Sequence, residues 1–310
     1  MNKILIFFII LFLLTSCTNA NNKEIIDRTG RTVKIKNQIN RVISTAPSNT
    51  EIIIDIGQAH KLVAVDKHSA NIEGIPENLQ GNLPLLDFFF PDAETIINLA
   101  PDLIIASGHN PTGSGEDPFR ILHEMGIPVV YISMSKSIQD IYLDIAFIAE
   151  LLQAKTEGEA LMNLMQTQID EIAYSAENVK NKKTVYFEIS AAPYMMTFGN
   201  ESYIDDMISV IGAINVFGKE RWLVQPDAET VINRNPDFIL TNINYIDDPI
   251  AEIKNRPGFN HINAVRNNRI FLIDTDSSVR PSARIVLAMR QMQEAIYPEI
   301  GTHGPRINTD

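Results

Sequence analysis

The clearest pattern of hydrophobic and polar positions is a segment that occurs twice at a constant offset. Residues 91–107 read PDAETIINLAPDLIIAS and residues 226–242 read PDAETVINRNPDFILTN, with ten identities in seventeen positions. In both copies a Pro-Asp pair precedes apolar residues at helical spacing, which predicts the start of a helix. A second Pro-Asp pair ends that helix, and the short apolar run after it predicts a buried strand. The chain therefore contains two related α/β units.

Short apolar strands alternate with helices elsewhere in the chain. The pattern predicts strands at 41–44, 62–65, 127–131, 184–189 and 270–273, and helices at 49–56, 121–126, 202–211 and 282–296. Such alternation is typical of parallel sheets covered by helices on both faces. We expect an α/β fold with two Rossmann-like lobes, an N-terminal one at 24–150 and a C-terminal one at 181–298.

Residues 137–179 carry apolar residues at helical spacing with no strand between them. Gly158 and the polar stretch around Lys155 predict a division into two helices. The second, about 24 residues long, would measure on the order of 36 Å at 1.5 Å per residue. We expect it to bridge the two lobes over residues 151–180, and we expect the Gly- and Pro-containing tail 299–310 to fray.

The N-terminus has the pattern of an export signal. Lys3 is followed by eleven apolar residues, which is shorter than the about 20 that span a membrane. Cys17, the only cysteine, follows small polar residues, and this predicts a signal peptide at 1–16 with lipidation of Cys17. Residues 17–23 would form a tether. The alternative is a plain secretory signal in which Cys17 is incidental.

Composition narrows the class of protein. The chain has 310 residues and a net charge of −12, which becomes −13 when cleavage removes Lys3. That length suffices for two domains, and 45% hydrophobic residues are ordinary for a globular protein. The acidic balance argues against nucleic-acid binding, which needs a basic surface. A single cysteine excludes an intramolecular disulfide.

In their order and spacing, several motifs together resemble the substrate-binding lipoproteins of ABC importers for iron chelates, haem and cobalamin. They are the export signal, the run from Arg41 through Ala46-Pro47-Ser48-Asn49-Thr50-Glu51, both Asp-Ala-Glu-Thr helix starts, and Arg280-Pro281-Ser282-Ala283-Arg284. The resemblance covers essentially the whole mature chain. It implies an exported, membrane-anchored monomer that is not an enzyme. Such a protein binds a metal chelate between its lobes and delivers it to a permease dimer with its ATPase.

The repeated glutamates Glu94 and Glu229 are the sharpest prediction. The resemblance implies that they dock onto arginines of the two permease subunits, one from each lobe. A glutamate in a first helical turn also stabilises its helix by about 0.3–1 kcal/mol, and the two roles are compatible. We expect the preceding Asp92 and Asp227 to cap these helices.

Ligands of open α/β sheets bind beyond the carboxyl ends of the strands. We expect the first lobe to contribute Ser48, Asn49 and His68, and the second to contribute Tyr194, Met196, Trp222 and Tyr245. Ordinary core packing is an equal alternative for the second group. Phe88 lies six residues before Glu94, where the resemblance places an aromatic residue that packs on cobalamin. A core plug formed by Phe88–Phe90 is the alternative.

Asp276 and Arg280 follow the last predicted strand. The resemblance aligns Asp276 with a ligand-contacting aspartate, and arginine suits ligands that carry carboxylates. A local Asp–Arg pair that holds the loop is the alternative.

The six histidines include no close pair, which argues against a site for a bare metal ion. A single histidine such as His68 or His109 remains possible as an axial ligand of a chelated metal. The sequence lacks the Gly-x-Ser-x-Gly, Walker A and His-Glu-x-x-His motifs of common enzyme classes. An enzyme that uses the same cleft, or a co-receptor for a membrane sensor, remains the alternative. The sequence does not choose among cobalamin, haem and ferric siderophore.

Overall fold

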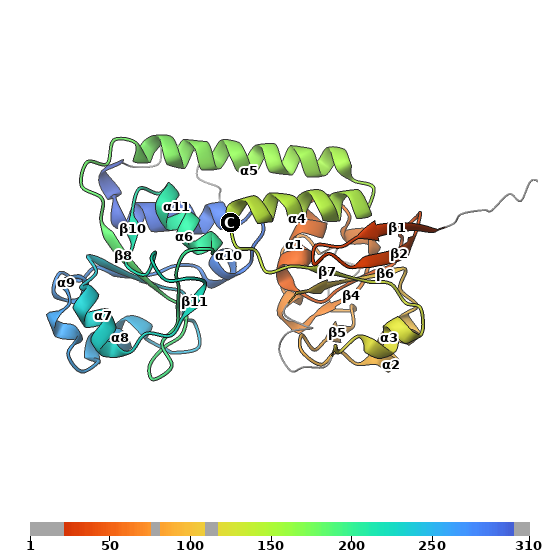
Figure 1. Cartoon of the computed structure of the whole chain (residues 1–310), viewed down its shortest axis with the longest axis horizontal. Coiled ribbons are helices and arrows are strands. Elements are labelled where there is room, and N and C mark those ends of the chain that lie inside the picture. Colours follow the sequence, from red (N-terminus) through yellow and green to blue (C-terminus); the bar gives the residue numbers. More distant parts are fainter. Residues whose placement is uncertain (1–21, 76–80, 109–116, 301–310) are drawn as a thin grey trace, which may run out of the picture.

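The computed structural model describes residues 22–75, 81–108 and 117–300. Two lobes lie side by side, and the long helix α5 (Lys155–Ala176) runs across both of them (Figure 1). Each lobe is built on its own parallel sheet. The predicted α/β fold with two lobes is therefore confirmed.

The N-terminal lobe contains a five-stranded sheet in the order β5-β4-β3-β6-β7, and all neighbouring strands are parallel. Its strands are β3 (Val42–Ser44), β4 (Leu62–Asp66), β5 (Leu85–Leu86), β6 (Leu103–Ser107) and β7 (Val129–Ile132). Its helices are α1 (Pro47–Asp55), α2 (Ala93–Leu99) and α3 (Arg120–Glu124). Successive residues Ile104 and Ile105 belong to different core clusters because strand side chains alternate between the two covered faces.

The C-terminal lobe contains a four-stranded parallel sheet in the order β10-β8-β12-β13. Its strands are β8 (Thr184–Glu188), β10 (Ile214–Asn215), β12 (Phe238–Thr241) and β13 (Ile270–Leu272), and β9 (Thr197–Phe198) pairs separately with β11 (Leu223–Val224). Its helices are α6 (Tyr203–Val210), α7 (Ala228–Arg234), α8 (Pro249–Asn255), α9 (Asn263–Arg266), α10 (Thr275–Val279) and α11 (Ile285–Ile296).

The bridge consists of α4 (Ile138–Leu151) and α5, which packs on α4 in one lobe and on α6 and α11 in the other. The break between them lies before Lys155, where Gln153 has a left-handed φ of 61°. Gly158 was predicted to help break the helix, but it lies inside α5. A Cβ at Gly158 would lie 2.4 Å from the Cβ of Ala149. The glycine therefore lets the two helices approach closely. Strand β8 begins soon after α5 ends.

An antiparallel hairpin precedes the N-terminal lobe and was not predicted. It consists of β1 (Asn22–Ile26) and β2 (Thr32–Lys36), so the last two residues of the predicted tether 17–23 belong to a strand. The predicted signal peptide 1–16, the predicted lipidation site Cys17 and residues 301–310 of the tail lie outside the described residues. No helix in the described part of the chain is both long and apolar enough to span a membrane.

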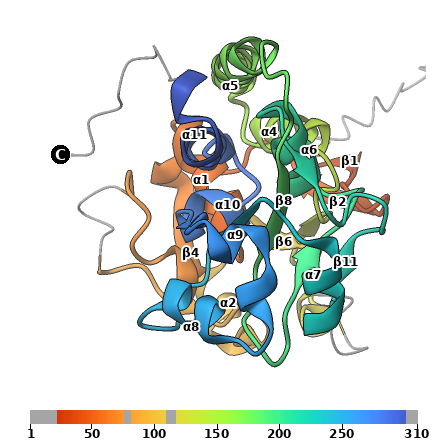
Figure 2. The ribbon, with the colours of Figure 1, turned by 90° about the vertical axis from the view of Figure 1, so that its left-hand side faces the viewer.

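The largest core cluster continues from one lobe into the other. It includes Ile53 of the N-terminal lobe, Met165 of α5, and Met207 and Met289 of the C-terminal lobe. Figure 2 shows α5, α11 and α4 gathered on one side of the molecule. Burial of each such side chain contributes about 1.5–3 kcal/mol, so the shared core holds the lobes in one arrangement.

Candidate ligand-binding site

The repeated segments begin their helices in the same way in both lobes. The Asp92 carboxylate accepts a hydrogen bond from Thr95 N at 2.8 Å, and Asp227 accepts one from Thr230 N at 2.7 Å. The hydrogen bonds from these threonines lower the pKa of both aspartates. The predicted helix caps are therefore confirmed.

Glu94 and Glu229 are both exposed. Their helices, α2 and α7, lie on the same side of the molecule, away from α5, in two perpendicular views (Figures 1 and 2). Within the described residues, neither carboxylate has a hydrogen bond or ion pair. The two unpaired carboxylates therefore belong to helices on the same side of the molecule, and permease docking stays a prediction.

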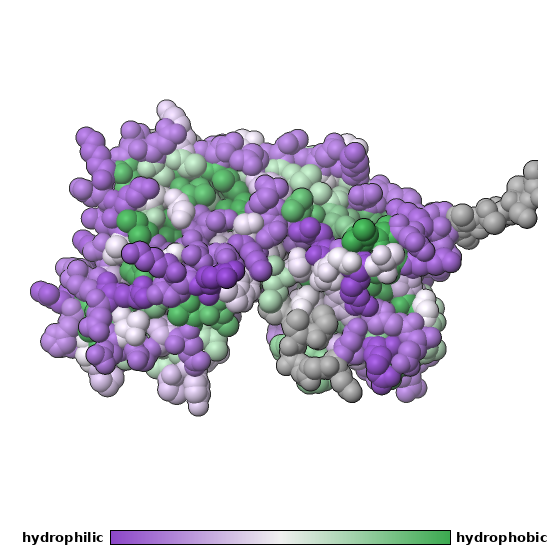
Figure 3. All heavy atoms as spheres, in the orientation of Figure 1, coloured by the Kyte–Doolittle hydropathy of each residue, from purple (hydrophilic) through white to green (hydrophobic). Residues whose placement is uncertain are grey.

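A cleft of about 630 Å³ lies between the lobes, a size typical of small-molecule sites. Residues at or beyond the carboxyl ends of the parallel strands line it, among them Ser107 at the end of β6, Ser133 after β7 and Asn242 after β12. Figure 3 shows a notch between the lobes on the side away from α5. The cleft therefore lies at the strand ends, where the sequence places the ligand, and ligand binding there stays a prediction.

Seven of the ten predicted ligand residues line this cleft: Ser48, Asn49, His68, Phe88, Trp222, Asp276 and Arg280. The structure does not bring the other three to its lining. Tyr194 is 68% exposed, and the Tyr245 hydroxyl accepts a hydrogen bond from Ala191 N at 2.9 Å. Met196 forms a bridge with Ser190. These three residues shape loops of the C-terminal lobe, whereas ligand binding by the seven stays a prediction.

Aromatic residues lie along both walls of the cleft. Phe88 and Phe89 line it with ring centroids 4.8 Å apart, edge to face. The Asp87 carboxylate accepts hydrogen bonds from Phe89 N and Phe90 N, both at 3.0 Å, and these fix the loop. Phe89 and Phe90 are 57% and 74% exposed, so the interpretation of this run as a core plug is wrong for both. Trp222 lines the opposite wall.

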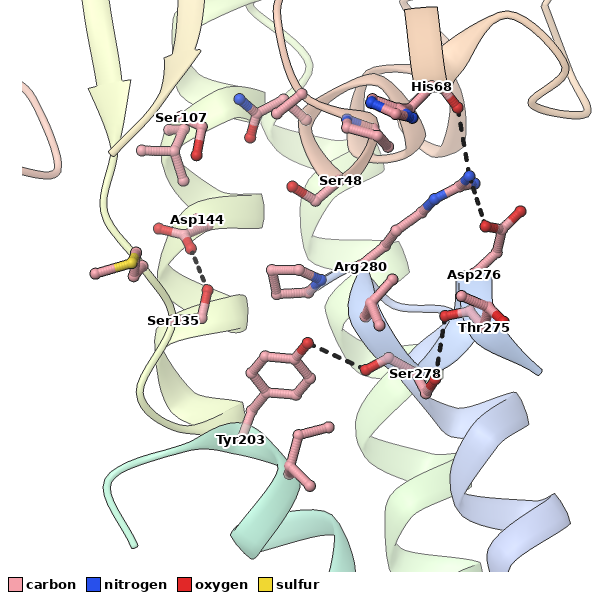
Figure 4. Close-up of a pocket in the computed structure, with 18 of the residues that line it drawn as sticks. Ser48, His68, Ser107, Ser135, Asp144, Tyr203, Thr275, Asp276, Ser278 and Arg280 are labelled. Carbon is pink, nitrogen blue, oxygen red and sulfur yellow. Dashed lines mark hydrogen bonds and ion pairs between the residues drawn. The ribbon is translucent and has the colours of Figure 1, made fainter. Parts of the chain in front are cut away.

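The back of the cleft is polar and was not predicted (Figure 4). Asp144 of α4 accepts hydrogen bonds from Arg28 Nε at 2.6 Å and Ser135 Oγ at 3.1 Å. Burial raises the pKa of Asp144 to about 6, although Arg28 opposes the shift. The Tyr203 hydroxyl donates to the Ser278 carbonyl at 3.1 Å. The sequence contained a signal for Asp144, because it lies three residues after Ile141 on the apolar face of a helix.

Arg280 joins the two lobes at the cleft wall. Its Nη1 donates to Glu51 Oε1 of α1 at 2.9 Å, and its Nη2 pairs with Asp276 Oδ1 at 2.7 Å and donates to His68 O at 3.4 Å. The local Asp276–Arg280 pair considered from the sequence is therefore present. Glu51 was missed. Burial raises its pKa, although the Ser282 hydroxyl and Arg280 oppose the shift.

Within the residues that the structure describes, no group of three or more His, Cys, Asp or Glu side chains could hold a metal ion. His68 lines the cleft, whereas His109 lies outside the described residues. The cleft therefore presents aromatic faces and scattered hydrogen-bonding groups.

A family model described as periplasmic binding protein matches residues 42–277, which contain both lobes and most of the cleft. The chain belongs to the periplasmic binding protein family.

The chain is 28% identical over 279 residues to an uncharacterised ABC transporter substrate-binding lipoprotein of Bacillus subtilis, covering 88% of this chain and 85% of that protein. It is 26% identical over 257 residues to a vitamin B12-binding protein of Vibrio campbellii, covering 82% of this chain and 88% of that protein.

A crystal structure of a possible iron-binding, periplasmic solute-binding protein from Staphylococcus epidermidis shares the fold. The TM-score is 0.74 at 29% identity, covering 84% of this chain and 99% of that one. The periplasmic haem-binding protein of Vibrio cholerae aligns with a TM-score of 0.73 at 24% identity, covering 83% and 99% of the two chains.

Proposed function

We propose that this chain is the substrate-binding protein of an ABC importer. It captures a metal chelate, namely cobalamin, haem or a ferric siderophore, in the cleft between its lobes and delivers it to a permease dimer powered by an ATPase. The observation that carries this proposal is the placement of the cleft mouth on the same side as the exposed helices α2 and α7 (Figures 1 and 3). A partner docked on Glu94 and Glu229 would then face the bound ligand.

The relatives support the same role. The Bacillus protein is named as an ABC transporter substrate-binding lipoprotein, and the Vibrio relative as a vitamin B12-binding protein. Family membership favours binding over the enzyme alternative. We propose further that the chain acts as an exported monomer, with Cys17 as its lipid anchor. Several acyl chains on one cysteine would give stable attachment, where a single chain is marginal.

The cleft suits a large ligand with apolar faces and a polar edge. Phe88, Phe89 and Trp222 offer ring faces and edges for packing on a planar macrocycle. Hydroxyl and amide side chains such as Ser48, Asn49 and Asn244 offer hydrogen bonds around it. The protein itself holds no cofactor in this proposal, since the metal arrives within the cargo.

Absorbance spectroscopy tests the proposal directly. The chain without its signal peptide is mixed with cyanocobalamin, haemin or a ferric siderophore and then freed of unbound ligand. We expect one of these coloured chelates to remain bound at one equivalent and chemically unchanged. Loss of all three on desalting would overturn the proposal, and conversion of the ligand into a product would favour the enzyme alternative.

Two aromatic residues of the C-terminal lobe provide a matched test of the cleft. Trp222→Ala should weaken binding of the retained chelate about tenfold or more, because Trp222 lines the cleft. Tyr194→Ala should leave affinity nearly unchanged, because Tyr194 is exposed and lies outside the lining. If the two substitutions changed the measured affinity equally, the ligand would not bind in this cleft.

A further inference from the structure

The cleft wall contains a single Arg or Lys among its described residues, and the protein itself uses that charge. Arg280 directs one terminal nitrogen to Glu51. Its other terminal nitrogen contacts Asp276 and the His68 carbonyl (Figure 4). Residues 76–80 and 109–116 contain no arginine or lysine. A carboxylate on a ligand therefore meets a guanidinium that already has two carboxylate partners.

Glu51 is fixed in place and cannot easily release Arg280. Its side chain is 1% exposed, and it comes from α1 in the opposite lobe. Its second oxygen accepts a hydrogen bond from the Ser282 hydroxyl at 2.6 Å. A ligand carboxylate that captured Arg280 would leave Glu51 as a buried charge without its cation, which is strongly unfavourable.

The other charged side chains of the cleft also disfavour the binding of a ligand carboxylate. The Asp276 side chain is 61% exposed beside Arg280, and Asp144 lies at the back of the cleft against Arg28. Behind this part of the wall, Arg284 also acts on Glu51 and pairs with Asp55 at 3.8 Å, so three carboxylates (Glu51, Asp55 and Asp276) face two guanidinium groups (Arg280 and Arg284). An added carboxylate is repelled at close range, whereas amide and hydroxyl groups are not.

We propose that Glu51 and Asp276 make this cleft select against chelates that carry free carboxylates. The preferred cargo is then a neutral or cationic chelate with amide or hydroxyl groups at its edge. This inference rests on the proposed function and narrows its ligand class. It assigns to Glu51, which lies behind the cleft wall, a role in setting specificity through Arg280.

Two pairs of probes that differ only in carboxylate charge test the inference. One pair is cyanocobalamin and its monocarboxylic acid, in which one side-chain amide is hydrolysed; the other is haemin and haemin dimethyl ester. For the pair that binds, we expect the uncharged-edge member to bind about tenfold or more tightly. Equal or tighter binding of the carboxylate member overturns the inference and leaves the proposed function intact. Failure of every chelate to bind overturns the proposed function.

Substitutions test which residues cause the preference against carboxylate-bearing chelates. Asp276→Asn, at an exposed side chain, and Glu51→Gln, of nearly unchanged shape, should each reduce the preference to about threefold or less, because each leaves Arg280 with one carboxylate fewer. Asp247→Asn is the matched control, since it removes an exposed carboxylate of the same lobe that does not line the cleft, and should keep the full preference. If Asp276→Asn and a folded Glu51→Gln both kept the wild-type ratio, these carboxylates would have no role in specificity.

Discussion

The two copies of the repeated segment show which of their shared residues maintain the fold. In each copy an aspartate caps the helix, and a second aspartate binds the start of the neighbouring strand. Asp102 N donates to Arg41 O at 2.8 Å, and its carboxylate accepts from Arg41 N at 3.0 Å. Asp237 repeats both bonds with Thr184, each at 3.0 Å. These repeated aspartates therefore have the same structural role in both lobes.

The copies differ where each lobe has its own surroundings. The residues before α2 form the exposed aromatic loop at Phe88–Phe90, whereas the equivalent stretch before α7 is β11, paired with β9. The helix ends also differ, with alanine at position 100 and asparagine at the equivalent position 235.

Glu94 and Glu229 stand apart from the repeated aspartates. Both are shared by the copies and exposed, yet their carboxylates form no hydrogen bond or ion pair within the described residues. Each glutamate therefore leaves a negative charge without a partner in the fold, and that charge is available for a contact outside it. The comparison thus supports the proposed docking role.

The largest expected effect comes from reversing these two charges. Glu94→Arg combined with Glu229→Arg should reduce uptake of the bound chelate by about a hundredfold or more, because each arginine would face a basic permease residue. Ligand affinity should hardly change, since both side chains are exposed and outside the cleft lining. The melting temperature should fall only slightly, because each glutamate stabilises its helix by about 0.3–1 kcal/mol. Uptake by cells and ligand titration of the purified protein measure the two quantities separately.

Asn98 and Asn233 supply the matched control for that experiment. They are also repeated and exposed, and lie four residues after the glutamates on the same helix faces. Asn98→Ala with Asn233→Ala should leave most of the uptake, because it changes no charge. Normal uptake by the charge-reversed protein would show that Glu94 and Glu229 are not needed for docking.

A smaller effect is expected at the strand-end aspartates. Asp237→Ala should lower the free energy of unfolding by about 1–2 kcal/mol, since it removes bonds to Thr184 N and Oγ1. Asp102→Ala should cost more, about 2–3 kcal/mol, because Asp102 also accepts from Asn40 N at 2.9 Å and Lys36 Nζ at 2.5 Å. Denaturant unfolding measures both. A larger loss at Asp237 would contradict this ranking.

The contribution of Asp102 to stability should also depend on pH. Burial raises its pKa, but hydrogen bonds from Lys36, Asn40 N and Arg41 N outweigh burial and lower it overall. A carboxyl with a lowered folded pKa stabilises fully above its unfolded value near 4, and the contribution is lost as pH falls through the folded pKa. The stability difference between wild type and Asp102→Asn should therefore shrink below about pH 4. If the stability difference between wild type and Asp102→Asn did not change with pH, the charge of Asp102 would not be what stabilises the fold.

The sequence was sufficient for features that depend on nearby residues. The helix caps at Asp92 and Asp227 and the strand at 238–241 follow from local pattern and are confirmed. Of the seven cleft residues, Ser48, Asn49, His68 and Trp222 followed from the rule that ligands bind at strand ends. Phe88 and Asp276 came from the family resemblance, and Arg280 from its place beside Asp276 after the last strand. Glu51 did not follow, because its partner Arg280 lies 229 residues away in the other lobe and only the folded chain brings the two together. Tyr245 was misplaced for the same reason, since its partner Ala191 lies 54 residues away.

The smallest expected effect has opposite signs in the two copies. Ala100 and Asn235 end their helices in the left-handed region, with φ of 44° and 45°. Alanine is strained there, so Ala100→Gly should raise the free energy of unfolding by about 0.5–1 kcal/mol. Asparagine tolerates this conformation, and Asn235 Oδ1 accepts a hydrogen bond from Asn263 N at 2.7 Å. Asn235→Gly should therefore lower stability by about 0.5–1 kcal/mol. Thermal unfolding of both variants checks the signs; a shift in the same direction would mean that the two helix ends are governed by backbone strain alone.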